Sequence, residues 1–69
     1  MKGFEIIISS PPDFKNLAVE IWHNDKMLAE INHESECLEL EVFGTFSIDF
    51  DGFFSALQQA RGRLIGNQS

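Results

Sequence analysis

Most of the chain divides into short runs in which apolar and polar side chains alternate. Alternation with a period of two residues is typical of β-strands that bury one face, and several of these runs are rich in β-branched residues. The pattern predicts strands over residues 4–9, 17–22, 26–32, 38–42 and 46–50.

The segments between these runs are short and contain turn-forming residues. The proline pair at residues 11–12 cannot extend a strand ladder. Asn24 and Asp25 tolerate the left-handed backbone region that a tight turn requires. Residues 33–36 form a polar connection, and Gly44 separates the last two runs. Because short connections leave neighbouring strands antiparallel, we expect an antiparallel meander.

The period changes near residue 50. Apolar residues then recur at helical spacing, at Phe53, Leu57, Ala60 and Leu64. Asp49 or Asp51 can cap the start of this helix and complement its positive end, and Gly66 can end it. We expect residues 1–66 to form a single domain and residues 67–69 to form a disordered tail.

The predicted fold class is α+β, an antiparallel β-meander of about five strands with one C-terminal α-helix packed on one face. Successive side chains of a strand point to opposite faces, so each face can be assigned. The helix is expected to cover the face that contains Ile6, Ile8, Leu17, Val19, Ile21, Met27, Ala29, Ile31, Leu38, Leu40, Val42, Phe46, Ile48 and Phe50. The opposite face is expected to be acidic and exposed, because no further segment is left to cover it.

Strand register then predicts which acidic residues are neighbours on that face. A turn centred on residues 34–35 sets Glu30 opposite Glu39, and a turn centred on Gly44 sets Glu39 opposite Asp49. The result is a row of three carboxylates spaced about 5 Å apart. Like charges in such positions destabilise a sheet, so the row suggests a surface that binds something positive. A register slip of one residue would remove the row.

Charge agrees with this interpretation. The 69 residues include eleven acidic and five basic residues, which gives a net charge of −6 and a pI near 4.6. Phosphate contacts need Lys and Arg, so we expect no direct binding to nucleic acid or to anionic membranes. A net negative charge favours basic protein surfaces as partners.

No catalytic motif, metal site or cofactor site is recognisable, and we expect no enzymatic activity. His23 and His33 lack zinc-ligand spacing, and weak calcium binding by Glu30, Glu39 and Asp49 is a minor alternative. Cys37 is the single cysteine, so no internal disulfide can form, which fits a reducing, cytoplasmic setting. No signal peptide and no membrane-spanning segment are expected.

The partner-binding residues that these patterns predict are Glu20, Trp22, Leu28, Glu30, Glu39, Glu41 and Asp49. The glutamates and the aspartate would form the charged array, and the tryptophan and the leucine would add apolar anchoring. Two alternatives stay open. In the first, the acidic face has no binding role and only keeps the protein soluble. In the second, Trp22 packs beneath the loop at residues 10–16 instead of contacting a partner.

Segments across most of the chain resemble a family of small uncharacterised bacterial proteins. These segments are GFEI at residues 3–6, SSPP at residues 9–12, AEINHE at residues 29–34 and DGFFSAL at residues 51–57. The resemblance implies a compact domain and no assigned activity. In size, acidity and lack of an active site, the chain is also similar in type to small inhibitors such as anti-CRISPR proteins and other DNA mimics.

Three functions are compatible with these patterns. The first is an acidic inhibitor, a DNA mimic that occupies a basic nucleic-acid-binding surface of its target protein. The second is a general protein-interaction module, such as an immunity protein, an antitoxin-like partner or a complex subunit. The third is a homodimer that buries the face around Trp22, although rows of acidic residues would oppose it and a monomer is expected.

Overall fold

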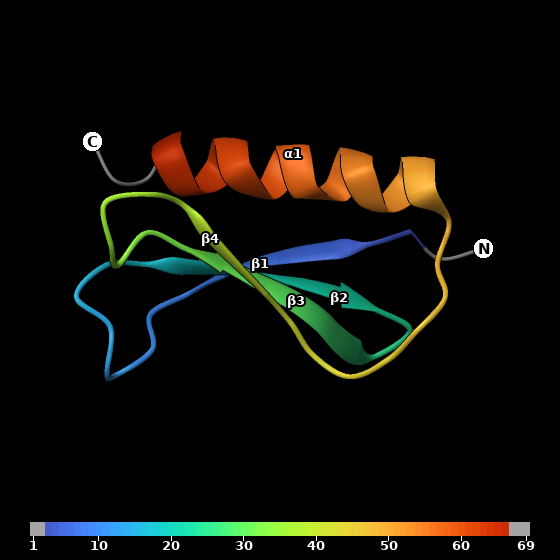
Figure 1. Cartoon of the computed structure of the whole chain (residues 1–69), viewed down its shortest axis with the longest axis horizontal. Coiled ribbons are helices and arrows are strands. Elements are labelled where there is room, and N and C mark those ends of the chain that lie inside the picture. Colours follow the sequence, from blue (N-terminus) through green and yellow to red (C-terminus); the bar gives the residue numbers. More distant parts are fainter. Residues whose placement is uncertain (1–2, 67–69) are drawn as a thin grey trace.

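The computed structural model describes residues 3–66, which form a twisted antiparallel sheet with one long helix across one face (Figure 1). The elements are β1 (Glu5–Ser9), β2 (Ala18–His23), β3 (Lys26–Asn32), β4 (Glu39–Val42) and α1 (Phe50–Gly66). The strands lie in sequence order across the sheet. The α+β class and the antiparallel meander with a C-terminal helix are therefore confirmed. The predicted tail at residues 67–69 lies outside the described residues.

The connection between β2 and β3 is the tight turn that the sequence predicts. Asn24 and Asp25 have φ angles of 52° and 63°, so two successive residues occupy the left-handed region. This backbone is typical of two-residue hairpin turns whose twist matches that of the strands. The register shifts just before the turn, where Ile21 faces Ala29 but Trp22 faces Met27. The extra residue, Leu28, marks a β-bulge that bends β3.

The prediction of a fifth strand is wrong, because the sheet formed by the described residues has four strands. Residues 46–49 are irregular, and Phe50 already belongs to α1. The Asp49 carboxylate accepts a hydrogen bond from the Gly52 N–H at 2.7 Å, and the Asp49 carbonyl accepts one from the Phe53 N–H at 3.0 Å. Asp49 is therefore the N-cap of α1, as one of the two predicted capping residues, and does not lie in a strand.

An aromatic cluster takes the place of the missing strand at this end of the sheet. Phe46 packs edge-on against Phe53, with ring centroids 5.9 Å apart. Phe4 also lies 5.9 Å from Phe53 and stacks on His23 at 4.7 Å. The alternating pattern around Phe46 therefore reflects a side chain that packs under the start of α1 rather than a strand.

The hydrophobic core lies between α1 and the first three strands. Val19, Ile21 and Ile31 of the sheet meet one face of α1, which presents Ala56, Ala60 and Leu64. Ile21, Leu64 and Val19 are the largest fully buried side chains. Because two of the three helix residues are alanines, the helix backbone can approach the sheet closely along this line.

A carboxylate connects the two loops at the far end of the sheet. Glu34, which follows β3, accepts hydrogen bonds from the backbone N–H groups of Lys15 and Asn16, both at 2.7 Å. These bonds, the one from Lys15 first, lower the pKa of the Glu34 carboxyl. The connection from β1 to β2 is thus held against the connection from β3 to β4.

The cap at Asp49 gives a test of the helix start. We expect Asp49→Ala to lower the free energy of unfolding by about 1 kcal/mol, because the Gly52 N–H loses its acceptor. Asp49→Asn keeps a side-chain oxygen there and should stay within a few tenths of a kcal/mol of wild type. Urea unfolding followed by circular dichroism measures both. Equal losses in the two variants would contradict a capping role.

Candidate protein-binding interface

The helix covers only part of the sheet, and β4 lies beyond its edge. α1 packs on β1, β2 and β3, and the whole of Glu39–Val42 stays outside this contact. A helix with its side chains is about 10 Å across, and neighbouring strands are about 4.8 Å apart, so one helix spans about three strands. Leu40 and Val42 are consequently 49% and 48% exposed. The expectation that the helix would cover these two residues is wrong.

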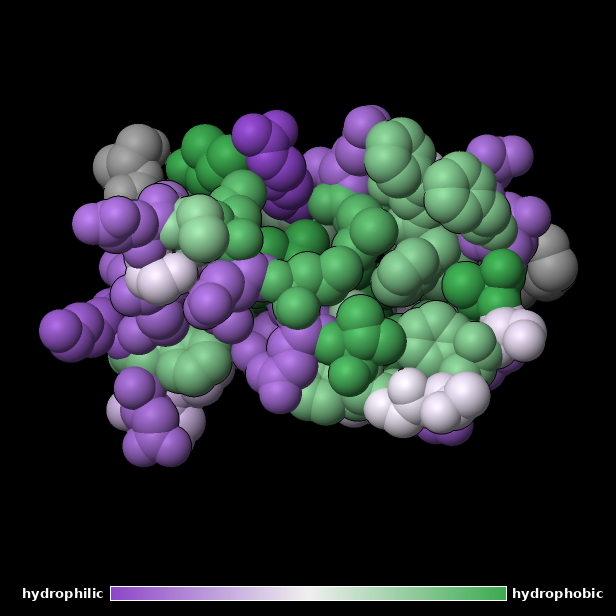
Figure 2. Space-filling model, in the orientation of Figure 1, coloured by the Kyte–Doolittle hydropathy of each residue, from purple (hydrophilic) through white to green (hydrophobic). Residues whose placement is uncertain are grey.

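An open apolar groove of about 600 Å³ runs between α1 and β4. Leu38 and Leu40 line it from the sheet side, and Phe54 and Leu57 line it from the helix. Phe50, which was expected to lie under the helix, is 75% exposed and stacks on Phe54 at 5.9 Å. Figure 2 shows apolar side chains gathered across the middle of this side of the molecule.

The backbone of β4 is open along the same side. Phe43, just after β4, donates a hydrogen bond to the carbonyl of Leu28 at 2.9 Å. Hydrogen-bonded pairs alternate along an antiparallel ladder, so Glu39 and Glu41 bond to β3. The N–H and C=O groups of Leu40 and Val42 then point to the free edge. Within residues 3–66 no further strand pairs with β4 there.

The opposite edge of the sheet, β1, differs. The Arg63 guanidinium reaches down from the last turn of α1 and donates a hydrogen bond to the Ile6 carbonyl at 3.0 Å. A charged side chain thus occupies one of the outward carbonyl groups of β1. An added strand would have to compete with this guanidinium for the Ile6 carbonyl, so β4 is the more available edge.

The sheet face opposite α1 contains a carboxylate row, but not the predicted one. Glu30 pairs with Glu41 rather than with Glu39, and on its other side Glu30 pairs with Glu20. Glu39 lies opposite Asn32, and Asp49 is far from this face at the helix cap. The register differs from the predicted one by two residues, which keeps each side chain on its face but changes its partner.

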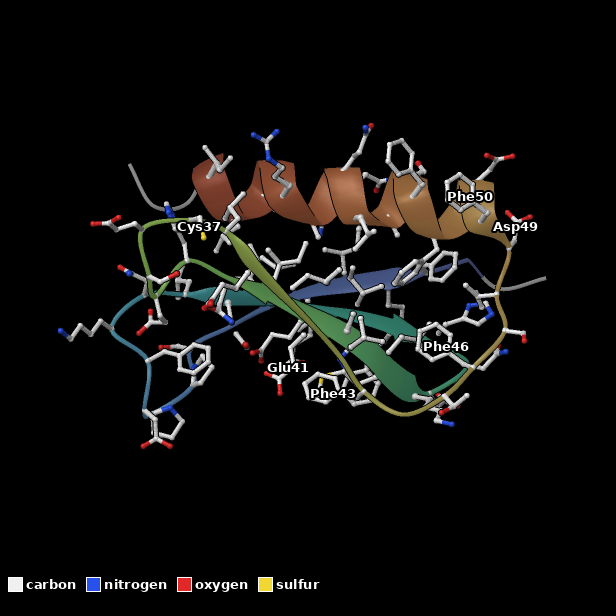
Figure 3. The ribbon with its side chains drawn as sticks, viewed as in Figure 1. Cys37, Glu41, Phe43, Phe46, Asp49 and Phe50 are labelled. Atoms are coloured by element: carbon white, nitrogen blue, oxygen red, sulfur yellow. The ribbon has the colours of Figure 1, made fainter. Side chains whose placement is uncertain are left out.

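This face is not uniformly exposed. Leu28, Glu30 and Asn32 along β3 are only 3%, 9% and 7% exposed. Trp22 is half-buried, and its indole N–H donates a hydrogen bond to the Glu20 carboxylate at 2.9 Å. Figure 3 shows Glu41 and Phe43 pointing away from α1 on this same side. The prediction that this face is acidic and exposed is therefore not confirmed, because its middle is buried and its exposed carboxylates lie at its margins.

Glu30 has an unfavourable electrostatic environment in the middle of the row. Burial raises the pKa of its carboxyl above the ordinary value of 4.5, and the neighbouring carboxylates of Glu41 and Glu20 raise it further. A positive group placed at the end of the row would relieve this repulsion.

The predicted partner-binding residues therefore separate into distinct environments. Glu39 and Glu41 are exposed on β4, whereas Glu20 and Trp22 are half-buried and hydrogen-bonded to each other. Leu28 and Glu30 are buried, and Asp49 is exposed at the start of α1. The sequence reasoning did not identify the exposed apolar side chains beside the acids, namely Leu40, Val42, Phe50 and Phe54. For Leu40 and Val42 the sequence did contain a signal. One helix is wide enough to cover about three strands, so a sheet of four or more strands must leave at least one strand uncovered.

The described part of the chain also bears on the expectations about metal binding, about Cys37 and about membrane-spanning segments. No three His, Cys, Asp or Glu side chains of residues 3–66 are placed to hold a metal ion, so the calcium alternative at Glu30, Glu39 and Asp49 fails. Cys37 is exposed in the loop before β4, not on a sheet face, and Ser35 donates a hydrogen bond to its carbonyl at 3.1 Å. No helix in this part of the chain has the length and hydrophobicity that crossing a membrane requires.

Comparisons of the chain with protein-family models, with curated proteins and with solved structures find no match. The functional assignment therefore depends on the geometry of the chain itself.

The buried carboxylate gives a prediction on pH. A carboxyl group whose pKa is raised in the folded state lowers stability when it is ionised. This loss develops as the pH rises from the ordinary value of 4.5 to the raised pKa and is complete above it. We therefore expect Glu30→Gln to be more stable than wild type at pH 7, and the difference to shrink as the pH falls toward 4.5. Thermal unfolding across this pH range measures it.

Glu39→Gln is the matched control, because Glu39 is exposed and faces Asn32 rather than another acid. It should change stability little at either pH. A wild-type chain that is more stable than Glu30→Gln at pH 7 would show that the Glu30 carboxylate has a stabilising partner.

Proposed function

We propose that this chain is a protein-binding module that receives a partner at β4 and in the groove between β4 and α1. The observation that carries the proposal is that Leu40 and Val42, on an edge strand, lie outside the cover of the helix. Phe50 and Phe54 extend the exposed apolar surface on the helix side. Contiguous apolar patches on small proteins commonly mark interaction sites.

The chemistry of this surface suits binding rather than catalysis. Its exposed side chains are mostly aliphatic, aromatic or acidic. Gln58 and one base, Arg61, also line the groove, and its lining residues within the described chain include no Ser, Thr or Cys. An apolar centre with a charged rim is the usual composition of a protein interface. The proposal corresponds to an immunity protein, an antitoxin-like partner or a complex subunit, and it assigns no enzymatic activity.

An acidic inhibitor that mimics DNA is the second candidate, and the row Glu20–Glu30–Glu41 favours it. Carboxylates at strand spacing could occupy phosphate sites on a basic protein. The burial of Glu30 and the Trp22 bond to Glu20 leave few carboxylates of the row free, which is why we rank this function, including an anti-CRISPR role, second.

Capture experiments with two matched variants test the proposed function. We expect the double variant Leu40→Thr with Val42→Thr to lose at least about tenfold of its partner binding, because two exposed apolar contacts disappear. Ile7→Thr with Ile8→Thr is the control on β1, where the two isoleucines are 42% and 40% exposed. Affinity capture from the cells that contain the chain, with quantitative mass spectrometry, compares wild type and both variants.

The proposed function is supported if a protein is captured by wild type and by the β1 control but not by the β4 variant. Capture that the β4 variant leaves intact refutes it. If that capture is instead abolished by added DNA or by high salt, the DNA mimic becomes the better description.

A further inference from the structure

The free edge of β4 and the side chains around it restrict the kind of partner that fits. The outward N–H and C=O groups of Leu40 and Val42 follow from the pairing of Phe43 with Leu28. An extended segment laid along β4 would satisfy these groups by adding a strand to the sheet, a common mode of peptide recognition. The edge at β1 is less suited, because Arg63 already bonds to the Ile6 carbonyl.

One side of the added strand would lie over the groove. Residues directly opposite each other in a strand pair point to the same face of the sheet. Partner residues opposite Leu40 and Val42 therefore point toward the helix side, where Phe54 and Leu57 line the groove. These partner positions require apolar side chains.

The other side of the added strand would meet acids. Partner residues opposite Glu39 and Glu41 extend the row that runs from Glu20 through Glu30 to Glu41. This row places three carboxylates on adjacent strands and ends at Glu41 on the open edge. The partner residue opposite Glu41 would therefore lie beside a negative charge that no base in the row compensates. Opposite charges in cross-strand positions are favourable, and these partner positions therefore suit Lys or Arg.

A second copy of this chain does not meet these requirements. Suppose that β4 pairs in antiparallel orientation with β4 of another copy. Two registers then pair three residues of each strand and place Leu40 and Val42 of both copies on the same face of the joined sheet. One sets Glu39 opposite Glu41, and the other sets Glu41 opposite itself. Both place like charges in contact between molecules that each carry a net charge of −6.

From these constraints we propose that the ligand of β4 is an extended segment of a different protein in which apolar residues alternate with Lys or Arg. The segment pairs with Leu40 and Val42 through its backbone, fills the groove with its apolar side chains, and sets its bases against Glu39 and Glu41. This inference depends on the proposed function and specifies the class of its partner.

The test uses a synthetic peptide of about seven residues, a typical strand length, in which valine alternates with lysine. Amide hydrogen exchange by NMR on the full chain reports the edge directly. We expect the peptide to protect the Leu40 and Val42 amides. A peptide with the same composition in two blocks, and one N-methylated on the pairing edge, should leave both amides unprotected.

Charge supplies an independent readout. Glu39→Gln with Glu41→Gln keeps the apolar side of β4 and should weaken peptide binding by about threefold to tenfold, since each cross-strand ion pair contributes modestly. The same double change should reduce the dependence of binding on salt. Binding that is unchanged in this variant would overturn the requirement for basic residues.

Two results separate this inference from the proposed function. If the lysate partner still depends on Leu40 and Val42 but the alternating peptide protects neither amide, the module stands and the strand ligand is wrong. If the Leu40 and Val42 amides become protected as the protein concentration rises without peptide, β4 pairs with a second copy and the inference is also overturned.

Discussion

The structure depends on how much sheet a single helix can cover. Below about 70 residues a chain has little apolar surface to bury, and here the burial is concentrated along one line of contact. Ala56, Ala60 and Leu64 bring the helix close to Val19, Ile21 and Ile31, and this close approach gives a tight core. It also fixes the helix over β1 to β3, so the fourth strand gains only the support of its neighbour.

This arrangement assigns stability and the proposed binding surface to different parts of one sheet. Val19 and Ile21, on β2, are fully buried, whereas every residue of β4 is exposed. The side chains that hold the fold together are thus not those of the proposed binding surface. Substitutions on β4 can change the binding surface while the contact between β2 and α1 remains intact.

Local sequence patterns were sufficient to predict most of the fold. Alternation gave the first four strands within one residue at each end, Asn24 and Asp25 gave the turn, and the spacing from Phe53 to Leu64 gave the helix. The fifth strand failed because Asp49 caps the helix and Phe46 packs against Phe53. Both interactions act through side chains, and alternation alone cannot distinguish them from a strand.

The candidate site was less predictable, because it depends on contacts between distant segments. The expected turn at residues 34–35 is replaced by a longer connection, in which the Glu34 carboxylate binds the backbone of Lys15 and Asn16. That connection moves the register of β4 by two residues and gives Glu30 a different partner. A shift of two residues leaves every side chain on its original face of the sheet. The prediction therefore placed Glu39 and Glu41 on the correct face but assigned them the wrong cross-strand partners.

The bond from Arg63 to Ile6 has a consequence for assembly size. A sheet with two open edges can add strands at both and continue into a fibre, as in cross-β aggregates. Here one edge carries an arginine from the same chain and the other is open, so an added strand meets less competition at β4 than at β1. Under the proposed function, this asymmetry would favour a complex with one added strand over an open-ended polymer.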